Sequence, residues 1–65
     1  MVTEETAVLT PVVTRRLEFC DAIEFINGWG QRGRARVMWH QGKTVSIDYL
    51  GCQHEILVTV VTAVL

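Results

Sequence analysis

The sequence lacks any apolar stretch long enough to cross a membrane as a helix. Its longest apolar run covers residues 56–65 and is interrupted by Thr59 and Thr62, whereas a spanning helix needs roughly 20 apolar residues. The first six residues are acidic at two positions and lack the basic and apolar regions of a signal peptide. We therefore expect a soluble, cytoplasmic protein with no membrane contact.

Cysteine and histidine are scarce, with two of each, and their spacing matches no metal site. Cys52 and His54, even taken with Cys20 and His40, lack the paired spacings typical of structural zinc sites. Any chain with two cysteines and two histidines offers a nucleophile and a base on paper, so these residues predict no catalysis. We expect no metal, no cofactor and no enzymatic activity, and two cysteines that are reduced and buried.

The chain is also too short for more than one domain. A domain of 65 residues buries only about 60% of the surface that its unfolded chain exposes. Yet 49% of the residues are hydrophobic, so part of the apolar surface needs another cover. We expect a single small domain over 1–65, frayed at 1–6, that self-associates as a homo-oligomer.

Residues 27–44 contain no acid, although the whole chain has a net charge of −1. This segment holds four basic residues, both tryptophans and four of the five glycines. Nucleic-acid-binding proteins use Arg and Lys to contact phosphates and aromatic rings to stack on bases. Gly28, Gly30 and Gly33 would let the backbone approach a ligand closely. The predicted binding residues are Trp29, Arg32, Arg34, Arg36, His40 and Lys43.

Three interpretations of this basic and aromatic segment stay open. It binds nucleic acid, with Trp29 as the stacking residue; or Arg34 and Arg36 pair with Asp48 and glutamates on a solvated face; or it binds protein, because Arg and Trp are favoured at interface hot spots. The first hypothesis is a small, non-enzymatic, oligomeric module that binds nucleic acid. The alternative is a protein-binding regulator or assembly factor that uses the same face or the apolar C-terminal strand.

Two alternating segments predict a β-hairpin at about 34–49. Ala35, Val37 and Trp39 share one face of the first strand, with Arg34, Arg36, Met38 and His40 on the other. The next alternating segment is 44–50. A three-residue loop, 40–42, brings the apolar faces together, because shifting a strand by one residue flips every side chain. Gly42 would take the left-handed position, and Arg34 would lie opposite Asp48.

Other segments are less clear. Residues 15–27 fit either an alternating strand or a helix with a stripe of apolar residues, and we favour the helix. Residues 7–14 are β-branched and apolar, but Pro11 restricts them to an edge strand or a broken one. Residues 55–64 predict one strand that is apolar on both faces. Because little protein is left to cover such a strand, it too favours self-association.

Residues 23–39 resemble the first motif of the Sm-like RNA-binding proteins. An alternating apolar strand is followed by a turn with glycine, a second glycine five residues later and another alternating strand. The Asp and Asn of the family's next turn are absent, and no second motif is visible near Gly51. The resemblance implies a small oligomeric β-barrel and assigns no site residue. Its matching positions are Ile23, Phe25, Gly28, Gly33, Ala35 and Val37.

We therefore predict a mainly β fold, or an α+β fold with one short helix near 15–27. Its architecture would be a small SH3- or Sm-like barrel or a strongly curved antiparallel sheet, completed by self-association.

Overall fold

The computed structural model describes residues 8–65, which form a mainly β structure, as predicted. Five antiparallel strands make one open sheet in the order β4-β3-β2-β1-β5. A short 3-10 helix, Val58–Val60, separates the last two strands, and residues 8–65 contain no α-helix. The strands are β1 (Ala22–Ile26), β2 (Arg32–Gln41), β3 (Thr44–Tyr49), β4 (Cys52–Leu57) and β5 (Val61–Val64).

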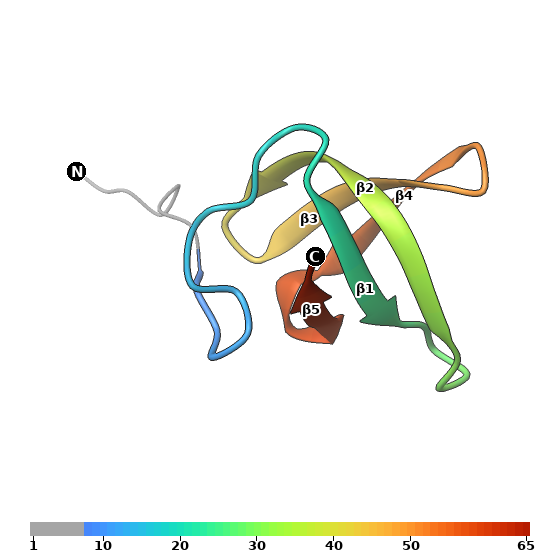
Figure 1. The fold of residues 1–65 in the computed structure, drawn as a ribbon, viewed down its shortest axis with the longest axis horizontal. Coiled ribbons are helices and arrows are strands. Elements are labelled where there is room, and N and C mark those ends of the chain that lie inside the picture. Colours follow the sequence, from blue (N-terminus) through green and yellow to red (C-terminus); the bar gives the residue numbers. More distant parts are fainter. Residues whose placement is uncertain (1–7) are drawn as a thin grey trace.

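The sheet is strongly bent. Its two edge strands follow each other directly in the chain, and the short connection between them can reach only if the two edges approach each other. Strand β4 ends at Leu57 and β5 begins at Val61, yet they form opposite edges of the sheet. Figure 1 shows the N-terminal segment, in blue, on one side of the curved sheet. The tips of the β1–β2 and β3–β4 hairpins lie on the opposite side (Figure 1).

The core lies against one face of this bent sheet. Alternate residues of each strand point to the same face, so the buried side chains of the central strands meet there. Val13 and Leu17, from the segment before β1, are also buried. The buried apolar side chains are Val13, Leu17, Ile23, Phe25, Ala35, Val37, Val45, Ile47, Val58 and Val61.

The helix favoured for residues 15–27 is wrong. Strand β1 occupies the second half, and a turn precedes it, in which Asp21 Oδ2 accepts hydrogen bonds from Glu18 N–H and Arg15 Nη1, both at 2.9 Å. The hydrogen bond from Arg15 is the main reason that the pKa of Asp21 lies below its ordinary value. Phe19, which a helical stripe would bury, is 68% exposed. Pairing with strands on both sides outweighs the helical preference of the segment.

The predicted hairpin is present, but its loop and register differ from the prediction. Gln41 pairs with Thr44, so the turn has two residues and not three, although Gly42 does have the expected positive φ of +58°. The register shifts between Val37 and Trp39, which is a β-bulge. The bulge adds one residue to β2, and this residue takes the place of the third residue predicted for the loop.

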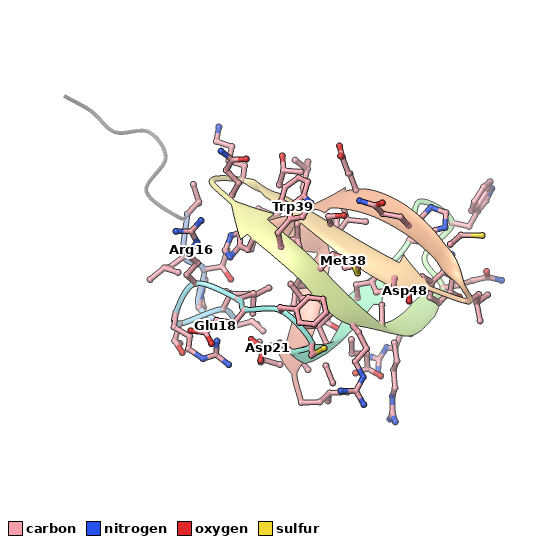
Figure 2. The ribbon with its side chains drawn as sticks, turned by 90° about the horizontal axis from the view of Figure 1, so that it is seen from above. Arg16, Glu18, Asp21, Met38, Trp39 and Asp48 are labelled. Carbon is pink, nitrogen blue, oxygen red and sulfur yellow. The ribbon has the colours of Figure 1, made fainter. Side chains whose placement is uncertain are left out.

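The bulge also exchanges the faces of two predicted side chains. Trp39, expected in the core, is 39% exposed, whereas His40, expected on the polar face, is only 2% exposed. Figure 2 shows Trp39 pointing away from Glu18 and Asp21 of the N-terminal segment. Arg36, and not Arg34, lies opposite Asp48.

The single strand predicted for residues 55–64 is also wrong. The 3-10 helix divides this stretch, so its first half completes β4 beside β3 and its second half forms β5 beside β1. Val58 N–H donates to Lys43 O at 2.8 Å, which fixes the break. Dividing the segment buries Val58 and Val61 within one subunit. The apolar character of this stretch therefore no longer requires a second subunit by itself.

The remaining expectations have mixed outcomes. Residues 8–14 form no strand, and Pro11 is exposed. Both cysteines are free but exposed, so the prediction that they are buried is wrong. The predicted fraying of residues 1–6 lies outside the described residues. Among residues 8–65, no helix has the length and apolar character that crossing a membrane would take.

Candidate binding pocket

The predicted binding residues do not form one site. Trp29 lies in the β1–β2 loop and Lys43 in the β2–β3 turn, and the ten residues of β2 separate these two turns. At about 3.3 Å per residue, β2 is roughly 30 Å long, and the two turns lie at its opposite ends. Lys43 therefore cannot act together with Trp29 on a short ligand.

The arginines share the outer face of β2, as predicted, but part of their charge is neutralised there. Arg34 Nε lies 3.7 Å from a carboxylate oxygen of Glu24, its cross-strand neighbour in β1. Arg36 donates from Nη1 to Cys20 O at 3.1 Å and lies opposite Asp48 in the register. These neighbours support the interpretation of this part of the basic segment as a solvated face.

His40 holds the N-terminal segment against the sheet and is unavailable to a ligand. Its Nδ1 accepts a hydrogen bond from Leu17 N–H at 2.9 Å, and its Nε2 lies 3.0 Å from Gly42 O. An acceptor at Nδ1 and a donor at Nε2 together define the neutral ring. Burial lowers the pKa of His40, the Gly42 carbonyl partly opposes this shift, and the positive charge of Arg16 adds to it.

Trp29 is the most exposed large apolar side chain of residues 8–65, at 87%, and its loop is held by hydrogen bonds. Asn27 Oδ1 accepts from the backbone N–H of Trp29 at 2.8 Å and of Gln31 at 3.0 Å. Asn27 also closes the loop through its own backbone, donating to Gln31 O and accepting from Gly30 N–H. The loop thus presents a large ring to solvent on an ordered backbone.

Beside this loop lies a pocket of about 290 Å³. Its walls come from the end of β1, the β1–β2 loop and the β3–β4 hairpin, so residues distant in the sequence meet there. Of the predicted binding residues, only Trp29 lines it. The lining residues are Phe25, Asn27, Gly28, Trp29, Ile47, Tyr49, His54, Glu55 and Ile56.

Three of the lining rings form a continuous edge-to-face series. Phe25 and Tyr49 have centroids 5.3 Å apart and planes 81° apart, and Tyr49 and His54 have centroids 6.1 Å apart and planes 65° apart. Such arrangements are favoured because the edge of one ring meets the electron-rich face of the next. All three residues contribute to the lining of the pocket.

Gly33 makes room for this arrangement. It lies opposite Phe25 in the β1–β2 register, and a Cβ atom there would lie 2.9 Å from Tyr49 Cε1 and 3.0 Å from Phe25 Cζ. The predicted role of Gly33, allowing a ligand to approach the backbone, is therefore wrong, because two rings of the protein occupy that space.

A cluster of metal-ligating side chains would mark another kind of site. No group of three or more His, Cys, Asp or Glu side chains within residues 8–65 is placed to hold a metal ion. Comparison with protein-family models, with curated proteins and with solved structures finds no match to this chain.

Proposed function

We propose that this protein is a non-enzymatic binding module that captures an extended segment of another protein, with one side chain of that segment in the pocket. The observation that carries the proposal is the aromatic-lined pocket next to β4. Within the part of the chain that the structure describes, this strand pairs with β3 alone and forms an edge of the sheet. An extended peptide can add to such an edge, where backbone hydrogen bonds supply affinity and a pocket supplies selectivity.

The size and lining of the pocket support this proposal. Small-molecule sites usually enclose about 300–1,000 Å³, and this pocket, at about 290 Å³, suits one side chain better than a whole cofactor. Trp29, Phe25 and Tyr49 are residue types that bury large areas at interfaces. The pocket thus has the character of a receptor for a single anchoring residue.

For the architecture, we propose a small barrel of the SH3- or Sm-like kind. The supporting features are the three successive hairpin-type pairings from β1 to β4, the short 3-10 connection and the return of β5 to β1. Self-association also remains a proposal, supported by exposed Leu50, Leu57 and Leu65. The two free cysteines fit a cytoplasmic location.

Binding of single-stranded nucleic acid is the second candidate, because Trp29 is exposed close to Arg32. An exposed ring near a cation is suited to stacking on a base while contacting a phosphate. We rank this candidate lower because Arg34 and Arg36 have acidic neighbours and the chain has a net charge of −1. Among residues 8–65, Arg34 is the one arginine of β2 with an ion pair, so the negative net charge of the chain is the main reason for this ranking.

A fluorescence-anisotropy titration distinguishes the two candidates. The probes are labelled ten-residue peptides that differ only in the central side chain, and labelled single-stranded DNA and RNA, each at 50 and 200 mM salt. We expect peptide binding that changes little with salt, weakens in Trp29→Ala and persists in the double variant Arg34→Ala/Arg36→Ala.

The opposite pattern would overturn the peptide proposal. Oligonucleotide binding that falls steeply with salt and weakens in the double arginine variant would mean phosphate neutralisation. The basic face would then be the functional surface, and the pocket would have at most an accessory role.

A further inference from the structure

We propose that the pocket selects a weakly hydrated cationic side chain, such as an arginine guanidinium or a methylated lysine ammonium, over a neutral apolar side chain of the same shape. This inference rests on the proposed capture of a protein segment and names the residue that would anchor it. It follows from the walls of the pocket, from the charges around it and from the lack of an ion pair inside it.

The lining of the pocket includes the rings of Tyr49, His54 and Trp29, whereas the ring of Phe25 is almost fully buried against Tyr49. Phe25 and Tyr49 stand nearly perpendicular to each other, and Tyr49 continues to His54 at 65°. Trp29 adds a large ring from the loop side. A cation within about 6 Å of a ring centroid is attracted by the negative potential of the ring face. A lining with several aromatic side chains therefore favours a cation over a neutral group of equal size.

The charges near the pocket have the sign that complements a cation. No Lys or Arg lines the pocket, and Glu55 is its only acidic residue. Arg32, at the start of β2, is the basic residue nearest to Trp29 in the sequence, and it does not line the pocket. Glu55 lies opposite Ser46 in the register, so strand alternation places its side chain on the face of β4 opposite to His54 and Ile56.

The absence of an acidic group inside the pocket determines which cation fits. His54 and Ile56 flank Glu55 and point to the other face of β4, so the interior is formed by rings and aliphatic groups. A lysine ammonium is compact and strongly hydrated, and burying it there would leave its hydrogen bonds unmade. A guanidinium or a methylated ammonium is hydrated more weakly and loses less when it enters an aromatic site.

A matched pair of small probes tests the charge preference directly. Choline and its neutral isostere 3,3-dimethylbutan-1-ol have the same shape and differ in the charge of the head group. Each is titrated into the full chain, and backbone amide chemical shifts of residues 25–33 and 47–56 are followed. We expect choline to bind roughly 2- to 30-fold more tightly than the neutral isostere, the range that a cation–π contact supplies.

Two tryptophan variants provide the matched controls. Trp29→Leu keeps an apolar side chain but removes a ring face, and because Trp29 is 87% exposed this change leaves the core intact. We expect the preference for choline to decrease while the isostere binds as before. Trp39→Leu alters the other exposed tryptophan, which lies outside the pocket lining, and we expect it to keep the full preference.

Peptides with central arginine, trimethyllysine or norleucine carry the same test to a protein segment. Preference for both cationic peptides over norleucine supports the inference. Equal affinity for choline and the isostere would overturn it and leave an apolar pocket, with capture of a protein segment still standing. Peptide binding without any response of the pocket amides to either probe would overturn it as well. Failure of every peptide and both probes to bind would remove the proposed function together with the inference.

Discussion

Replacing Gly33 with alanine tests whether the aromatic walls of the pocket depend on a missing side chain. The new Cβ would lie 2.9 Å from Tyr49 Cε1, 3.0 Å from Phe25 Cζ and 3.2 Å from Phe25 Cε1. Carbon atoms attract each other best at about 3.5–4.0 Å, so all three contacts are repulsive. Phe25 is almost fully buried, and its ring already touches Tyr49. The partly buried Tyr49 ring must therefore move outward into the pocket.

The magnitude follows from two opposing effects. Overpacking a well-filled site costs about 1–3 kcal/mol. Gly33 does not have a positive φ, so alanine is allowed there and lowers the entropy of the unfolded chain, which stabilises by about 0.4–1 kcal/mol. The overpacking is larger, and we expect a net loss of about 1 kcal/mol or more, which lowers Tm by about 4–8 °C per kcal/mol for a domain of this size.

Thermal unfolding followed by circular dichroism measures this effect, with Gly28→Ala as the control. A Cβ at Gly28 would meet nothing within 4 Å, and its φ is not positive, so the control keeps the entropy effect without the overlap. The Gly33 variant should melt below the wild type, and the Gly28 variant should not. If Gly33→Ala melted as high as Gly28→Ala, the assignment of Gly33 as the space for the two rings would be refuted.

Three further predictions concern the buried histidine and two turns. Burial holds the pKa of His40 below its ordinary value, so as the pH falls this histidine is protonated in the unfolded chain before it is protonated in the folded one. The free energy of unfolding should therefore decrease as the pH falls below about 6.5. Urea titrations at several pH values measure this decrease, which should be weaker in His40→Gln. Leu50 has φ +54° and is 84% exposed; because asparagine tolerates this left-handed conformation better, Leu50→Asn should stabilise by about 1 kcal/mol, and a lower Tm in this variant would contradict the strain. Asn27→Ala removes the acceptor for two loop N–H groups and should cost about 1 kcal/mol; unchanged hydrogen exchange at the Trp29 amide would show that the loop is held by other contacts.

The sequence predicted the central hairpin because alternation is a local signal. It did not predict the register, because a β-bulge has no local signature in this segment. Both Trp39 and His40 suit an exposed or a buried position on pattern alone. The outcome depends on Leu17 and Gly42, which supply the two hydrogen bonds of the buried imidazole, and Leu17 is remote in the sequence.

The candidate site was predicted only in its exposed part. Trp29 could be placed in a glycine-rich loop because Asn27 and the glycines mark a turn. Phe25, Tyr49 and His54 come from three different strands. Their rings meet only when β1 has paired with β2, β2 with β3 and β3 with β4. The division of residues 55–64 was missed for a similar reason, since β-branched residues favour a strand whether or not it is interrupted.

The return of β5 to β1 has a consequence for how the chain folds. The pairings from β1 to β4 join neighbouring strands through short turns, whereas β5 brings Val64 beside Ile23 from the far end of the sheet. Closing the loop between such distant residues costs chain entropy before any contact rewards it. We expect the three hairpin pairings to form first and the docking of β5 to complete the fold. The same strand should be the first to detach in native-state hydrogen exchange, exposing the β1 edge while the central hairpin stays closed.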